Sequence, residues 1–235
     1  MSVLTVDDLT FELKPSSSRR TLEITVDRSG ELVLLAPPEV PEAQLREFVL
    51  AKRFWIYTKL AEKDRLQKVV PVKSFVDGEG FLYLGRSYRL RLIDPQQEAQ
   101  QVPIKLLNGR FMLRRDRVAD ARAHLVQWYS RHAQPWLWAK VQEYVARMEV
   151  QPASLRVQDL GYRWGSCGKG DTLYFHWKTI LLPPRVAEYV VVHELAHLHQ
   201  PHHTPQFWHR VERALPDFER RKTWLAEHGM DVEGL

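Results

Sequence analysis

The segment His193-Glu194-Leu195-Ala196-His197 carries residue types that can hold a metal ion and activate water. Two histidines four residues apart lie on the same face of a helix, so both imidazoles can reach one ion. The glutamate beside the first histidine can then act as a general base toward a metal-bound water. Because a catalytic zinc usually has three protein ligands and one open position, we expect a third ligand nearby.

A turn between two predicted helices follows this motif. Pro201 is expected to end the first helix, because the residue before a proline is driven out of the α region. Thr204 is a typical N-cap, and Pro205 is a typical first residue of the next helix. His203 therefore lies on the turn, where it can reach back to the first helix as the third ligand.

Other side chains compete for the third ligand position. His202 stands beside His203 on the same turn. An acidic third ligand is the other alternative, and the residues that could supply it are Glu212, Asp217 and Glu219.

A purely structural metal would need a fourth protein ligand. For that role the sequence offers only Cys167 and His176. The arrangement that we favour is one zinc ion per chain with an open fourth position, held by His193, His197 and His203.

Several short motifs around these histidines resemble one known family. They are Arg163-Trp164-Gly165-Ser166-Cys167, Thr172-Leu173-Tyr174-Phe175-His176-Trp177, Pro183-Pro184, Val191-Val192-His193-Glu194-Leu195-Ala196-His197-Leu198 and His203-Thr204-Pro205-Gln206-Phe207-Trp208. Together they resemble the YgjP-like metal-dependent hydrolases, which are related to the SprT and WLM-type zinc metallopeptidases. The resemblance covers residues 155–230 and implies a zincin-like metallopeptidase fold with an HExxH motif and a downstream third histidine. Where a metzincin carries glycine, this chain has Gln200, so it departs from that clan.

Composition and length favour an intracellular enzyme. The 235 residues can hold one large domain or two small ones. No stretch has the length of a transmembrane helix, and residues 1–4 lack the beginning of a secretory signal. The single cysteine, Cys167, excludes an intrachain disulfide and fits a reducing compartment. We therefore expect a cytoplasmic protein without a membrane partner.

The net charge of +5 indicates a weak attraction to polyanions. Solvated faces explain most of the basic residues. Those near the middle of the chain are Arg86, Arg89, Arg91, Arg114, Arg115 and Arg117. Weak nucleic-acid binding is kept as an alternative, because the resemblance to SprT proteins implies it: their eukaryotic members act on DNA-bound proteins.

The two halves of the chain differ in their hydrophobic pattern. Residues 1–115 are predicted to be a β-rich N-terminal region with one long helix at about 41–68, and Asn108-Gly109 predicts a hairpin turn. Residues 116–235 are predicted to be the zincin-like metallopeptidase domain, with Pro135 kinking or splitting a helix. The expected fold is α+β, with the HExxH helix beside a small sheet. No internal repeat is evident in the sequence.

The predicted function is that of a zinc-dependent metallopeptidase, in which Glu194 activates the metal-bound water. Its substrates are expected to be peptides or unfolded proteins. Residues 172–177 are expected to form an edge strand beside the site, where an extended peptide can add as a further strand. The donor to the developing oxyanion is expected among three residues, Tyr174, His176 and Arg163.

Two alternatives use the same site. The first is hydrolysis of a nucleoside triphosphate, whose phosphates would contact Arg163, Lys169 or Lys178. The second is a SprT-like protease that acts on nucleic-acid-bound proteins. The sequence does not distinguish these activities, because all of them require the same ligands and the same base.

Overall fold

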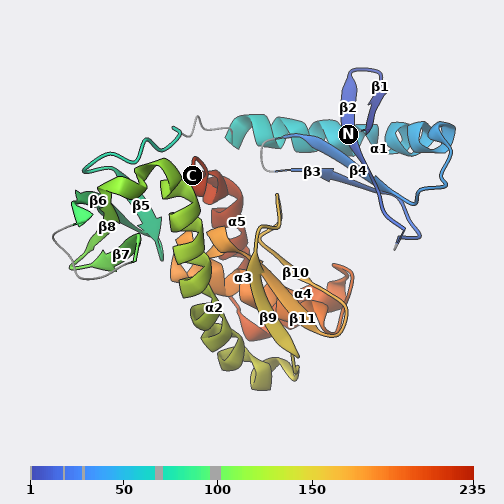
Figure 1. Cartoon of the computed structure of the whole chain (residues 1–235). Helices are drawn as coiled ribbons and strands as arrows, with labels where there is room; N and C mark the ends of the chain where they lie inside the picture. Colours follow the sequence, from blue (N-terminus) through green and yellow to red (C-terminus); the bar gives the residue numbers. More distant parts are fainter. Residues whose placement is uncertain (1, 18, 28–29, 67–70, 96–101) are drawn as a thin grey trace. The chain divides into compact units, whose positions relative to one another are not determined.

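The computed structural model describes residues 2–17, 19–27, 30–66, 71–95 and 102–235. The chain forms two compact units, residues 1–69 and 70–235 (Figure 1). Each unit combines strands with helices, which confirms the expected α+β class.

The first unit is a four-stranded sheet followed by a long helix. Its elements are β1 (Ser2–Val6), β2 (Leu9–Pro15), β3 (Glu23–Val26), β4 (Leu32–Ala36) and α1 (Glu42–Leu66). The strand order is β1-β2-β4-β3, in which the two outer pairs are antiparallel and the central pair is parallel. Alternation along the strands directs Phe11 and Leu34 into the core, where Ile56 of α1 meets them. The helix predicted at about 41–68 is confirmed over Glu42–Leu66, and residues 67 and 68 lie outside the described residues.

The second unit begins with a sheet of the same topology. Its strands are β5 (Gly80–Tyr83), β6 (Arg86–Ile93), β7 (Ile104–Leu107) and β8 (Arg110–Arg114). The order is β5-β6-β8-β7, again with antiparallel outer pairs and a parallel central pair. A short 3-10 helix, η2 (Arg115–Asp120), and a long helix, α2 (Ala121–Met148), follow. The chain therefore contains one strand order twice, although no repeat is evident in its sequence.

Local sequence signals explain two details of this region. Asn108 and Gly109 form the turn between β7 and β8 with φ values of 48° and 72°, as the predicted hairpin requires. Pro135 lies inside α2, but the helix is not divided there. Although α1 and α2 are long, no helix in the described ranges is apolar enough over a sufficient length to cross a membrane.

Aromatic packing joins the second sheet to α2. The Phe111 ring of β8 lies edge-on to two rings of α2, at 4.9 Å from Trp128 and 5.9 Å from Tyr129. These residues belong to the same hydrophobic core as α3, so the compact unit begins at residue 70. The boundary predicted at 115/116 follows the change from strand to helix, which falls inside this unit.

A three-stranded sheet lies beside the metal-binding motif. Its strands are β9 (Ser154–Gln158), β10 (Gly165–Cys167) and β11 (Thr172–His176), in the order β10-β11-β9. β11 is antiparallel to β10 and parallel to β9. The prediction that residues 172–177 form an edge strand is therefore wrong, because neighbours occupy both sides of β11. The edge strand that packs on the motif helix is β10.

The remaining elements surround that helix. They are η3 (Trp177–Leu181), α3 (Pro184–His197), α4 (Pro205–Ala214), α5 (Phe218–His228) and η4 (Gly229–Val232). α3 carries the motif and packs against α2, α4, α5 and β10, so its orientation is fixed on several sides. It ends at His197, four residues before Pro201, the residue that was expected to end it.

Candidate metal centre

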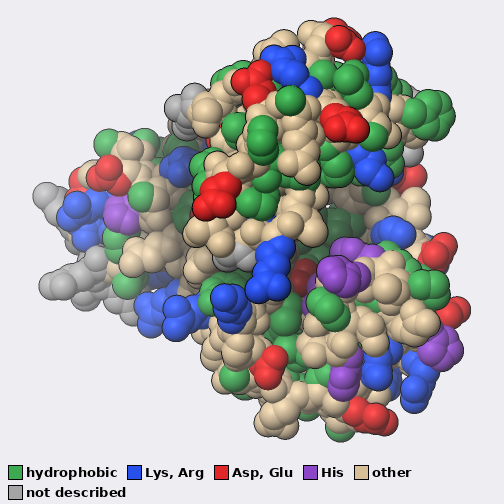
Figure 2. Space-filling model, turned by 90° about the vertical axis from the view of Figure 1, so that its right-hand side faces the viewer, with side chains coloured by type: hydrophobic (Ala, Val, Ile, Leu, Met, Phe, Trp, Pro, Cys, Tyr) green, Lys and Arg blue, Asp and Glu red, His purple; other side chains and the backbone are tan. Residues whose placement is uncertain are grey.

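Three histidines from α3 and the turn after it come together. The ligand nitrogens of His193, His197 and His203 lie within 4.8 Å of one another. The Nε2 atoms of His193 and His203 are 3.0 Å apart. Two tetrahedral ligands at Zn–N distances of about 2.0 Å stand about 3.3 Å apart, so this spacing fits a shared ion. His203 is exposed, and Figure 2 shows exposed histidine side chains in several separate places on the face in view.

Contacts of the ring nitrogens suit metal binding. His197 Nδ1 lies 3.0 Å from the carbonyl oxygen of Gln200 and can donate to it, which leaves the Nε2 lone pair available. Burial is the main cause that lowers the pKa of His193, to about 3, and it also lowers the pKa of His197 and His203. All three imidazoles are therefore neutral near pH 7, which is the form that binds a metal. The donor set fits zinc.

Aromatic residues of α4 pack against the three imidazoles. The buried Phe207 ring contacts all of them, with centroid separations of 4.6 to 5.0 Å. Trp208 stacks on His203 at 5.6 Å, and Lys222 lies over the Trp208 ring at 4.4 Å. Thr204 caps α4 as predicted, since its side chain accepts a bond from the Phe207 N–H. The sequence indicates these aromatic residues only as part of a motif that resembles the YgjP-like family.

The side chain of Glu194 points from α3 toward β10, and the residue is only 5% exposed. Its side chain lies close to Gly165, since a Cβ added at that residue would stand 2.6 Å from Glu194 Cγ and 2.7 Å from Oε1. The Cys167 N–H donates a hydrogen bond to the carboxyl group. Burial raises the pKa of Glu194 to about 8, against the opposing effects of the Arg163 charge and of that hydrogen bond. A cation held by the histidines would favour the ionised form.

The contact between β10 and Glu194 was not predicted. In the sequence, residue 165 is recognisable only as part of a motif. The structure requires glycine there because the carboxyl group of Glu194 reaches the backbone. Alternation along β10 places Gly165 and Cys167 on the face toward α3. The same alternation places Ser166 on the other face of the sheet. Tyr174, which is paired with Ser166 on β11, is on that face too.

This arrangement separates the three residues that were expected to donate to an oxyanion. Tyr174 is on the face of the sheet that points away from Glu194. His176 is buried, and its ring contacts the backbone N–H of Lys178 at 3.0 Å and Asp159 at 3.3 Å. Arg163 alone of the three acts electrostatically on Glu194.

The alternative ligands do not join the histidines. Within the described part of the chain, one group of three possible ligands converges, and it consists of His193, His197 and His203. The group does not include His202, Cys167 or His176. Burial raises the pKa of Cys167 to about 11, so its side chain is a thiol rather than a thiolate. The acidic alternatives, Glu212, Asp217 and Glu219, are also outside the group.

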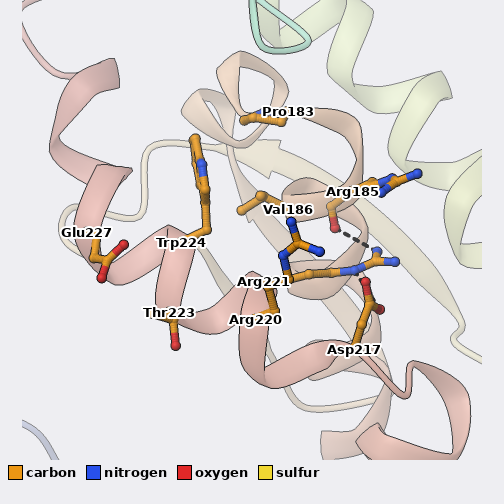
Figure 3. A pocket seen from close by; sticks show the side chains of 9 residues that line it. All are labelled: Pro183, Arg185, Val186, Asp217, Arg220, Arg221, Thr223, Trp224 and Glu227. Atoms are coloured by element: carbon orange, nitrogen blue, oxygen red, sulfur yellow. Dashed lines mark hydrogen bonds and ion pairs between the residues drawn. The ribbon is translucent and has the colours of Figure 1, made fainter.

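Arg221 of α5 braces the first half of α3. Its guanidinium donates to the carbonyl oxygen of Arg185 at 2.8 Å and forms an ion pair with Asp217 (Figure 3). It forms a second ion pair with Glu188. Arg185, Asp217 and Arg221 border a pocket of about 470 Å³ between the start of α3 and α5. The three histidines do not line this pocket, so it is distinct from the metal centre.

The family of the chain follows from a direct comparison. A model of the YgjP-like metallopeptidase domain matches residues 20–228. The chain belongs to the YgjP-like metallopeptidase family. It is therefore a metallopeptidase-type hydrolase, a class that depends on a metal ion.

One solved structure is also similar to part of this YgjP-like chain. It is the crystal structure of the metallopeptidase zymogen abylysin of Pyrococcus abyssi, with 24% identity and a TM-score of 0.34. The match covers 37% of this chain and 86% of that one. No curated protein sequence matches the chain significantly.

Proposed function

We propose that this protein is a zinc-dependent peptidase in which His193, His197 and His203 hold one zinc ion and Glu194 is the general base. The observation that carries the proposal is the convergence of three neutral imidazoles on one helix-turn-helix segment, next in sequence to a buried carboxyl group. A donor set of three histidines leaves a position free for substrate or water, as catalytic zinc sites require.

Each group has a defined task in this proposal. When bound by the histidines, zinc would polarise the carbonyl of the scissile peptide bond and lower the pKa of a water molecule. Glu194 accepts a proton from that water and delivers it to the leaving amine. Arg163 contributes positive charge near Glu194, which favours the ionised carboxylate that accepts the proton.

We assign to β10 the substrate-binding role that the sequence predicted for residues 172–177. Within the described residues, β10 is paired on one side only, by β11. An extended peptide can add to the other side through main-chain hydrogen bonds, which select weakly among side chains. Unfolded or flexible proteins should then be cleaved in preference to compact ones, because a strand inside a folded sheet cannot leave it.

The variant Glu194→Gln tests the proposal directly. Glutamine preserves the shape of the side chain and removes the base, so cleavage of unfolded casein should fall by about a hundredfold to ten-thousandfold. Elemental analysis should still find one zinc ion per chain, since the three ligands are intact. Unchanged cleavage by the purified variant would contradict the role of Glu194.

The same assay separates peptide hydrolysis from nucleotide hydrolysis. A panel of nucleoside triphosphates is offered beside casein, with Glu194→Gln as the control for contaminating enzymes. Hydrolysis of a nucleotide that requires Glu194, without any cleavage of protein, would replace the proposed activity by the alternative. Lys178, one of the expected phosphate contacts, is already paired with Glu233.

A further inference from the structure

The sheet β5-β6-β8-β7 has a second face, opposite the hydrophobic core. Leu90 of β6 and Phe111 of β8 are paired and point into the core, so their neighbours Arg89 and Arg110 point outward. The outward positions of the four strands contain no acidic residue. We call this surface the cationic face, and its basic residues are Arg89, Arg91, Lys105, Arg110 and Arg114.

Two arginines are directly opposite each other on this face. Arg89 of β6 is in register with Arg110 of β8, and both are exposed. Like charges at paired positions of a sheet are destabilising. Neither arginine, nor Arg91 beside them, forms a salt bridge with any of the described residues; Arg89 donates to the carbonyl oxygen of Gly78 at 2.8 Å. Arg114 differs, because Asp116 binds it through two hydrogen bonds.

The first sheet shows that this topology does not require such a charge pattern. In the equivalent parallel pair, Glu12 of β2 is opposite Val33 of β4, and Lys14 is opposite Leu35. Glu12 and Lys14 also form an ion pair at 2.9 Å. The repulsion between paired arginines is therefore particular to the second sheet, and an anionic ligand would relieve it.

We propose that the cationic face binds the phosphate backbone of a nucleic-acid duplex. Neighbouring strands are about 4.8 Å apart and every second residue advances about 6.7 Å, so the guanidinium groups form a grid that successive phosphates can contact. Guanidinium groups suit phosphate because of their planar, paired donors. The outward strand positions carry no aromatic side chain on which unpaired bases could stack, so the backbone of a duplex fits this face better than a single strand.

Binding of this kind is independent of sequence and of the metal centre. The proposed contacts use strands β6, β7 and β8, so they require neither zinc nor Glu194. A failure of the peptidase proposal would leave this inference intact, and the reverse also holds.

Fluorescence anisotropy of a labelled DNA duplex, measured with the full chain at several salt concentrations, tests the proposal. The double variant Arg89→Gln/Arg110→Gln should bind at least about tenfold more weakly. The slope of log K against log salt should fall by about two, because each phosphate contact contributes about 0.9. The matched control is Arg213→Gln/Arg220→Gln, which removes two exposed arginines of α4 and α5 and should bind nearly as the wild type does.

Two further measurements complete the test. The double variant Arg89→Lys/Arg110→Lys keeps the charge and should retain most of the affinity and the salt slope. Arg110→Gln alone should melt at or above the wild-type temperature, because it removes a like-charge pair. Equal loss of affinity in both glutamine double variants would overturn the proposal, since general charge would then suffice. Binding to phosphatidylserine vesicles without binding to the duplex would overturn it as well.

Discussion

The carboxyl group of Glu194 on α3 lies against the backbone of Gly165 on β10, and no Cβ fits between them. The contact joins the edge strand of the small sheet to the proposed general base. A change of one methyl group at the strand must therefore move the carboxyl group, the strand or both.

Gly165→Ala is expected to reduce peptidase activity by about a hundredfold, since a displacement of about 1 Å at a reacting group has an effect of that size. Zinc content should stay at one ion per chain. The control is Ser166→Ala, whose side chain points to the opposite face of β10. Steady-state cleavage of casein measures both, and an equal decrease in the two variants would contradict a specific role for Gly165.

His203→Ala should lose zinc, whereas His202→Ala should keep it. His203 converges with the two histidines on α3, whereas its neighbour His202 is exposed and lies outside the group. Both proteins are dialysed against metal-free buffer and examined by elemental analysis. If the two variants retained equal amounts of zinc, the assignment of the third ligand would be incorrect.

Trp208→Leu is expected to weaken zinc binding by about tenfold to a hundredfold, because residues that orient a ligand contribute on that scale. The indole stacks on His203 and is itself covered by Lys222. Trp224→Leu is the control, since that indole stacks on His228 instead. Competition with a chromogenic chelator measures the zinc affinity of both variants. Trp208→Leu should bind zinc about tenfold to a hundredfold more weakly than Trp224→Leu.

Arg221→Gln should lower the free energy of unfolding by about 2 kcal/mol. Breaking a fully buried ion pair costs about 3–5 kcal/mol. The effect is smaller here, because the side chains of Arg221 and Glu188 are 13% and 17% exposed to solvent. The melting temperature should fall by about 4–8 °C for a unit of this size. A double-mutant cycle with Glu188→Gln measures the coupling, and strictly additive losses would show that the pair does not act together.

Local chemistry made much of the candidate site predictable. The spacing of His193 and His197, the end of the helix before Pro201 and the cap at Thr204 are all set by a few neighbouring residues. The same holds for the hairpin at Asn108-Gly109, whose backbone conformation few other residue pairs adopt readily. These features needed no information about distant parts of the chain.

Long-range pairing could not be predicted in the same way. Whether β10 or β11 lies at the edge depends on β9, which precedes both in the sequence and pairs with the later strand. The need for glycine at residue 165 arises from a carboxyl group 29 positions later, at Glu194. The repeated strand order is also invisible in the sequence, because many different side chains satisfy the same alternation of buried and exposed positions.

The order of the elements has a consequence for a chain that is still being synthesised. Both four-stranded sheets and the helices that follow them precede the first residue of the metal centre, and His203 comes after everything that it completes. A growing polypeptide therefore exposes two histidines of α3 before α4 exists to position the third. Because the ligand set closes last, an unfinished chain would lack hydrolytic activity while its own strands are still unpaired and open to cleavage.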